Sequence, residues 1–222
     1  EKPFIVIDGK FPILISAPHG ARTFRDNDKE VWHEEDEYTA GMAMLLKETC
    51  NTSAIATIFK NEDYDPNYVS DNDVPYKQEL RETIKTNKIK YVIDLHGAGK
   101  YSKSLANTQL VDLGLGSDND YLPKTHMDKL VDLIEFQLGD GATSRNGKRG
   151  FPAAKSGTVA YFCNKLGVEV VQIEMRPQLR VAHRFQTASL YKNDGKYDAD
   201  PNCITHMLQA LVDFIEYLKE EA

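Results

Sequence analysis

The stretch "YVIDLHGAG" at residues 91–99 is a short apolar run that ends on a His-Gly pair. The stretch "ISAPHGAR" at residues 15–22 has the same pattern, so that His19 and His96 each stand at the end of an apolar run. Short continuous apolar runs are typical of strands that are covered on both faces. We therefore expect two buried strands that each end on a histidine, with a glycine next to it that lets the chain turn sharply.

The apolar run that leads to His19 covers 11–16, and further runs of the same β-rich kind lie at 53–59 and 168–174. Apolar residues with helical spacing stand between and after these runs, at 38–49, 127–134, 156–167 and 201–218. Strand and helix therefore alternate, which predicts an α/β fold with a largely parallel or mixed sheet. Two polar, turn-rich segments, 61–76 and 192–201, show neither pattern and are expected to be loops.

The composition and charge of the chain argue against nucleic acid and membranes as partners. The chain has 222 residues, 41% of them hydrophobic, which is enough for one substantial core. Its formal net charge of -7 argues against nonspecific binding to nucleic acid, and no apolar run approaches the roughly 18 residues of a membrane span. Three scattered cysteines without a CxxC pair indicate free thiols. We expect a cytoplasmic protein with neither nucleic acid nor membrane as a partner, although a start at Glu1 leaves room for a removed leader.

Three of the expected strands carry reactive side chains at their carboxyl ends: His19, His96 and Glu174. Ligands of open α/β sheets bind beyond this edge. Two imidazoles and a carboxylate suit a divalent transition metal. Asp94 lies two residues before His96 and on the same side of an ideal strand, where it can orient a ligand or accept from a backbone amide. The sequence therefore predicts a metal site at this edge.

Spacing alone leaves open which carboxylate completes the site. The stretch "WHEEDEYT" at 32–39 places four acidic residues at a helix start, Glu34, Glu35, Asp36 and Glu37. If one of them faces the metal, Glu174 is free to act as a base on water. Asp36 is also placed to cap the helix with its side chain, and a salt bridge to Arg176 would equally explain Glu174.

Four motifs together resemble the N-formylglutamate amidohydrolase family. They are "SAPHGA" (16–21), "EEDEYTAGMA" (34–43), "IDLHGAG" (93–99) and "VVQIEMR" (170–176). That family belongs with the zinc carboxypeptidase-like hydrolases and is similar to the phage poly-γ-glutamate hydrolases. The likeness implies one domain over residues 1–222, built as a three-layer sandwich around a mixed, largely parallel sheet.

The resemblance also implies a site. In these families zinc is held by two histidines and an acidic residue, and a glutamate acts as the catalytic base. Carried over to this chain, His19 and His96 are zinc ligands and Glu174 is the base. The acidic ligand of the related hydrolases precedes a helical threonine by three positions, which selects Asp36 before Thr39.

Three more residues receive substrate roles from the resemblance. Arg176 would hold a substrate carboxylate or steady the oxyanion, Arg180 competes with it for that role, and Asn67 would contact substrate. The chain departs from the family in two places. Arg22 stands where an HxxE motif would have its glutamate, and Asn67 lacks the arginine that usually follows it.

The expected function is zinc-dependent hydrolysis of an amide bond in a small acidic substrate, such as an N-acyl amino acid or a γ-glutamyl compound. Two alternatives remain open. One is an iron-dependent dioxygenase in which His19, His96 and Glu174 form a 2-His-1-carboxylate site. The other is a binding module that keeps the fold without the chemistry.

Overall fold

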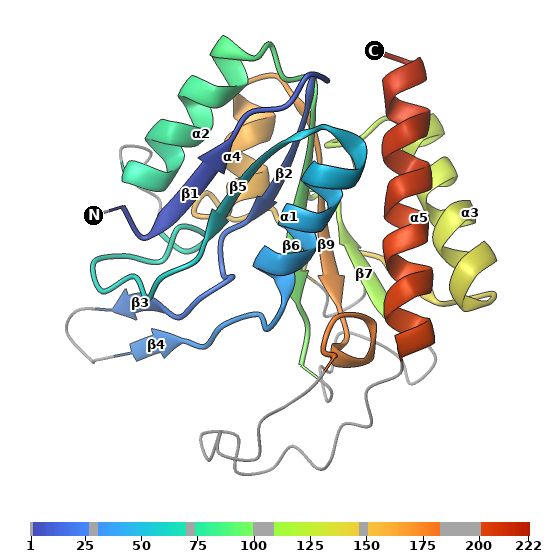
Figure 1. The fold of residues 1–222 in the computed structure, drawn as a ribbon, viewed down its shortest axis with the longest axis horizontal. Helices are drawn as coiled ribbons and strands as arrows, with labels where there is room; N and C mark the ends of the chain where they lie inside the picture. The colour runs from blue at the N-terminus through green and yellow to red at the C-terminus, as the bar shows by residue number, and fades with distance from the viewer. Residues whose placement is uncertain (1, 27–30, 70–73, 100–108, 147–150, 183–200) are drawn as a thin grey trace.

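A seven-stranded sheet forms the centre of the molecule, in the order β1-β5-β2-β6-β9-β7-β8 (Figure 1). The computed structural model describes residues 2–26, 31–69, 74–99, 109–146, 151–182 and 201–222. The strands of this sheet are β1 (Phe4–Ile7), β2 (Ile13–Ala17), β5 (Ser53–Thr57), β6 (Tyr91–Gly97), β7 (Val111–Gly114), β8 (Thr143–Arg145) and β9 (Glu169–Met175). β5, β2, β6 and β9 run parallel, whereas β1 pairs antiparallel with β5 and β7 pairs antiparallel with β9; β8 runs parallel to β7. The expected mixed, largely parallel sheet is confirmed.

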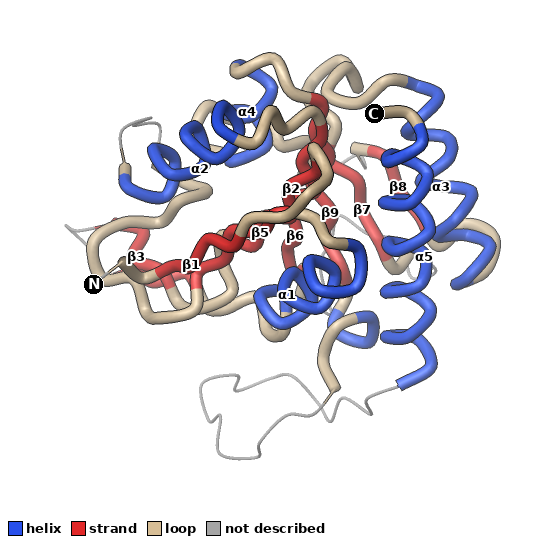
Figure 2. The backbone as a smooth tube through the Cα atoms, turned by 45° about the horizontal axis from the view of Figure 1, so that its top comes forward, coloured by secondary structure: helices blue, strands red, loops and turns tan. Residues whose placement is uncertain are grey.

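Helices cover both faces of the sheet and make three layers (Figure 2). The helices are α1 (Thr39–Cys50), α2 (Pro75–Thr86), α3 (Lys124–Leu138), α4 (Val159–Lys165) and α5 (Pro201–Glu220), with a 3-10 turn η1 at Pro177–Leu179. One apolar core joins the sheet to α1, α3 and α5, and a second joins it to α2 and α4. In the described part of the chain, none of the helices has the length and apolar character needed to cross a membrane.

Alternation along the strands decides which residues face the site. Val92 of β6 and Val170 of β9 belong to the core under α2 and α4, whereas Ile93 and Val171 belong to the opposite core. Because side chains two apart share a face, the residues that follow Val92 and Val170 at even numbers all point to the α2 and α4 side. Toward the carboxyl ends of β6 and β9, that face changes from apolar to polar.

Two elements differ from the sequence-based expectation. Segment 61–76 was expected to be a loop, but α2 begins inside it at Pro75. The apolar stripe of α2, Tyr76, Leu80 and Ile84, repeats every four residues among polar neighbours and gives a weak pattern. A separate hairpin of β3 (Thr23–Asp26) and β4 (Val31–His33) projects beside the sheet. The other expected loop, 192–201, lies outside the described residues except for Pro201.

Candidate metal centre and its pocket

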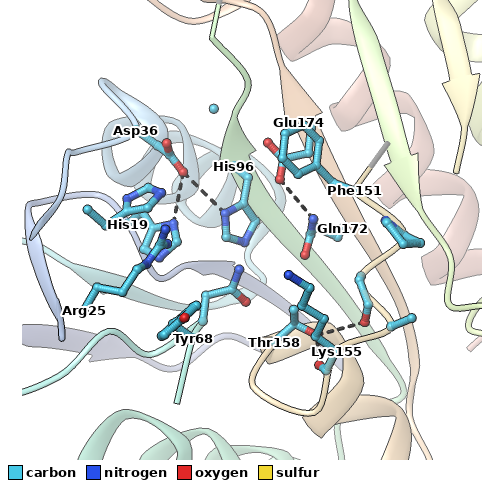
Figure 3. A pocket seen from close by; sticks show the side chains of 16 residues that line it. His19, Arg25, Asp36, Tyr68, His96, Phe151, Lys155, Thr158, Gln172 and Glu174 are labelled. Atoms are coloured by element: carbon cyan, nitrogen blue, oxygen red, sulfur yellow. Dashed lines mark hydrogen bonds and ion pairs between the residues drawn. The ribbon is translucent and has the colours of Figure 1, made fainter. Parts of the chain in front are cut away.

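Two histidines and one aspartate meet at the carboxyl end of β2 and β6 (Figure 3). His19 follows β2 directly and His96 is near the end of β6, and both are almost fully buried. The Asp36 carboxylate reaches between them: its Oδ2 atom is 3.3 Å from Nδ1 of His19 and 3.3 Å from Nδ1 of His96. The sequence-predicted set of His19, Asp36 and His96 is therefore brought together at one oxygen atom.

Asp36 presents its side chain to the histidines because its backbone is fixed by other contacts. Its amide donates to the carbonyl oxygen of His19 at 2.7 Å, and its own carbonyl accepts from both the amide and the hydroxyl of Thr39. The residue at the cap position of α1 is Tyr38, in a left-handed conformation. The sequence-based expectation that the Asp36 side chain caps this helix is therefore wrong, and the carboxylate is free to face the two rings.

A second pair of carboxylates orients the rings from behind. Nε2 of His19 lies 2.7 Å from Oδ1 of Asp65, whose other oxygen accepts from Nε of Arg25 at 2.8 Å. Nε2 of His96 lies 3.1 Å from Oδ2 of Asp94. An ionised carboxylate accepts a hydrogen bond from the Nε2–H group, and in the neutral ring this leaves the lone pair on Nδ1, the atom that faces Asp36. This carboxylate–histidine arrangement is the usual support of metal-binding histidines.

The charges of the centre also suit a cation. Burial alone would lower the pKa of His19, but Asp65 and Asp36 raise it to about 9. Burial likewise opposes the charged form of His96, yet Asp94 and Asp36 raise its pKa well above the ordinary value. The pKa of Asp36 is lowered well below its usual range, against burial, by hydrogen bonding and charge from the two rings. Without a metal, protons on the imidazoles therefore balance the carboxylates, and a divalent cation can take their place.

His33 also lies close to the centre, although no motif in the sequence predicts it there. One atom each from His19, His33 and Asp36 lie within 4.8 Å of one another. The rings of His19 and His33, however, stack at 3.8 Å with only 23° between their planes. A ligated metal lies in the plane of the imidazole ring, so two nearly parallel stacked rings do not converge on one ion.

The ring of His96 has the orientation that His33 lacks. The planes of His19 and His96 meet at 78°, and the ring centroids are 5.0 Å apart. Nδ1 of each of these two rings faces the same Asp36 oxygen at 3.3 Å. Nδ1 of His19 is buried and has no well-oriented hydrogen bond within the described residues, and the same is true of Nδ1 of His33, so this observation does not separate His33 from His96. The ring orientations and the shared Asp36 oxygen therefore favour His19, Asp36 and His96 as the residues that could hold a metal, with His33 packed on one side of them.

Glu174 stands beside this centre on the neighbouring strand. It pairs in register with His96 across β6 and β9, and its Oε1 accepts from Nε2 of Gln172 at 3.0 Å. Burial raises the pKa of Glu174 to about 7; His96 opposes the rise and Asp36 adds to it. A carboxylate with this pKa can take and return a proton at neutral pH.

These residues open into a cavity of about 480 Å³. Its described lining consists of His19, Arg25, His33, Asp36, Asn67, Tyr68, His96, Gly97, Phe151, Pro152, Ala153, Ala154, Lys155, Thr158, Gln172 and Glu174. The metal-binding set and Glu174 occupy one side, and the loop that carries Lys155 and Thr158 forms another (Figure 3). Asn67 is also in the lining, although its side-chain oxygen already accepts from the amide of Val159 at 2.7 Å.

The two arginines that were expected to bind substrate are not part of this described lining. Arg180 is buried, and its guanidinium donates to the carbonyl oxygens of Glu37 at 2.7 Å and of Met175 at 3.3 Å. A side chain at Gly97 would collide with it, since a Cβ there would come within 2.6 Å of the guanidinium. Arg176 is also buried, which lowers its pKa.

Several site residues could not be found by the sequence reasoning. Asp65 was placed in a solvated loop, but it is fully buried against His19. Arg25 lies on the β3–β4 hairpin and Lys155 on a loop, where neither residue belongs to a periodic pattern. Gln172 had a usable signal, because it precedes Glu174 by two positions and so shares its face of the strand.

Comparison with known proteins gives the fold but no sequence family. No family model matches this chain, and no curated protein matches it. An N-formylglutamate amidohydrolase from Ralstonia eutropha has a similar structure, with a TM-score of 0.64, 16% identity, and 99% of each chain covered. A gene product of Agrobacterium tumefaciens gives a TM-score of 0.63 at 14% identity, covering 100% of this chain and 96% of the other. A bacteriophage poly-gamma-glutamate hydrolase gives 0.56 at 14% identity, covering 99% and 91%.

The structures that resemble this chain thus include the same two kinds of protein that its four short motifs resemble. Identities of 14% to 16% establish a shared fold and not a shared activity. Function has to be argued from the site.

Proposed function

We propose that this chain is a zinc-dependent amidohydrolase that acts on a small acidic substrate, such as an N-acyl amino acid or a γ-glutamyl compound. The observation that carries the proposal is the placement of one Asp36 oxygen 3.3 Å from Nδ1 of both His19 and His96. Two solved structures of similar fold are named as hydrolases of glutamate derivatives, which supports this choice of bond and substrate class.

Three side chains would hold the ion: His19, Asp36 and His96. Two imidazole nitrogens and one carboxylate oxygen match the ligand preference of zinc, and three protein ligands leave a position open for catalysis. When bound, zinc acts as a Lewis acid that acidifies water and polarises a carbonyl group. Asp65 and Asp94 keep the two rings in the orientation that this binding requires.

Glu174 would move the proton. Its carboxylate takes a proton from the attacking water and gives it to the nitrogen that leaves when the C–N bond breaks. Gln172 donates to one oxygen of Glu174 and so fixes the direction of the carboxylate. The substrate roles that the family resemblance implies for Arg176, Arg180 and Asn67 stay predictions.

The dioxygenase alternative is less consistent with the geometry. It requires Glu174 as the third ligand beside His19 and His96. The carboxylate that contacts both rings is instead that of Asp36, while Glu174 is held by Gln172. An inactive binding module would have the same site but no turnover, so the hydrolysis assay described below distinguishes it from the enzyme.

The Glu174→Gln variant tests the function. It keeps the size of the side chain and removes its basicity, so we expect full zinc content and a rate that falls by roughly 10²–10⁴-fold. Zinc is measured by mass spectrometry, and turnover on a panel of N-formyl and N-acetyl amino acids and γ-glutamyl peptides. Glu48→Gln, at a solvent-exposed glutamate, is the matched control and should change neither quantity.

Two results would contradict the proposal. Loss of metal from Glu174→Gln would make Glu174 a ligand, as in the dioxygenase alternative. A zinc-loaded wild-type protein that hydrolyses nothing on the panel would instead favour the binding module.

A further inference from the structure

The pocket has two cationic side chains among its described lining residues, Arg25 and Lys155. The charge of Arg25 is already compensated, since its Nε is 2.8 Å from Oδ2 of Asp65 and its guanidinium stacks 4.8 Å from the ring centre of Tyr68. Lys155 is exposed, and within the described residues its ammonium group has neither an ion pair nor a hydrogen bond. Among the lysine and arginine side chains of the described lining, Lys155 is therefore the one that remains available to a ligand.

The backbone that carries Lys155 is fixed on both sides. The Thr158 hydroxyl donates to the carbonyl oxygens of Ala153 at 2.8 Å and Lys155 at 2.9 Å, and the Thr158 amide donates to the same Lys155 oxygen. Upstream, the Phe151 amide donates to the Asp112 side chain at 3.1 Å. A fixed backbone confines the ammonium to one side of the cavity, toward which the Lys155 side chain points (Figure 3).

Two carboxylates, those of Asp36 and Glu174, line the opposite side of the pocket. The metal or the imidazole protons would balance the charge of Asp36, which leaves the ionised form of Glu174 to repel a substrate carboxylate unless a cation stands near that carboxylate. The arginines expected to serve this purpose, Arg176 and Arg180, are absent from the described lining.

We propose that Lys155 binds a carboxylate of the substrate and so sets the preference for acidic substrates. This inference rests on the proposed function, because it assumes that the cavity beside Glu174 receives the substrate. A single ammonium on a flexible stem pairs with a carboxylate without demanding one geometry, so the preference concerns charge more than shape.

Binding of two small acids to the zinc-loaded protein tests the inference. Glutarate and pentanoate have the same number of carbons, and only glutarate carries a second carboxylate. Calorimetry should show that wild-type protein binds glutarate more tightly than pentanoate. Lys155→Ala should lose roughly twofold to fivefold in affinity for glutarate, the range of an exposed ion pair, and leave pentanoate unchanged. Lys155→Arg should keep most of the preference.

Lys85→Ala is the matched control, because it removes the same charge from the last turn of α2 and should behave as wild type. Unchanged zinc content and melting temperature would show that Lys155→Ala is folded. The inference is overturned if wild-type protein does not prefer glutarate, or if Lys155→Ala keeps the preference or weakens both acids equally. The affinities for glutarate and pentanoate are measured without turnover. A failed hydrolysis assay would therefore contradict the proposed function without contradicting the binding of a carboxylate by Lys155.

Discussion

At the scale of single residues, the site depends on carboxylates that do not touch the metal. His19 is oriented by Asp65, and Asp65 is in turn held by Arg25. The meeting of His19, Asp36 and His96 was predictable, since all three stand in short motifs, and their role as ligands stays a prediction. Asp65 was not predictable, because it is 46 positions from His19 in a polar stretch, and only folding shows that the stretch turns inward.

Asp65→Asn tests this support. The amide keeps the size of the carboxylate but loses its charge, so His19 is held less firmly as a ligand. We expect zinc affinity to fall by about 10- to 100-fold, as is typical for such supporting residues. Competition with a coloured chelator measures the affinity, and Asp63→Asn, in the same loop but exposed, is the control. Equal affinity in the Asp65 variant and wild type would show that Asp65 does not act through His19.

Zinc binding should depend on pH in a defined direction. In the metal-free protein the pKa of His19 is about 9, so at neutral pH the ring carries a proton that must leave before Nδ1 can bind zinc. Apparent affinity should therefore rise with pH, by about tenfold per unit for each proton released, until pH approaches 9. Calorimetry in buffers of different ionisation enthalpy counts the protons. An affinity that is flat from pH 6.5 to 8.5 would contradict the assignment.

At the scale of elements, close packing between β2, β5 and α1 places His19. A Cβ added to Gly20 would come within 2.5 Å of both the Thr57 carbonyl oxygen and the Ala40 side chain. Gly20→Ala should therefore lower the free energy of unfolding by about 1–3 kcal/mol. Gly41→Ala on α1 is the control: nothing lies within 4 Å of the added carbon, and removal of a helical glycine should stabilise by about 0.5–1 kcal/mol.

Urea unfolding of the two variants measures both changes. A Gly20→Ala protein as stable as wild type would mean that the turn after β2 accommodates a side chain. Steric crowding would then not explain why a glycine follows His19. The glycine after His19 predicts a turn from the sequence alone. The atoms that require a glycine there lie on β5 and α1, and only the folded structure identifies them.

At the scale of the whole molecule, the central strands were predictable and the edges were not. β2, β5, β6 and β9 are continuous apolar runs because helices cover both of their faces. β1, β7 and β8 are three or four residues long, which is too short for a clear period. The order of the sheet places β6 between β2 and β9, so that His19, His96 and Glu174 come from three adjacent strands. The extent of the domain and the cytoplasmic location stay predictions.

The central claim is that His19, Asp36 and His96 hold one zinc ion while His33 only packs against His19. The direct test is the metal content of purified protein, by mass spectrometry, for wild type, His96→Ala and His33→Ala. We expect about one zinc per chain in wild type and in His33→Ala, and little zinc in His96→Ala. The reason is that the ring planes of His19 and His96 meet at 78°, which allows both rings to bind one ion. Zinc retained in His96→Ala and lost from His33→Ala would contradict the central claim.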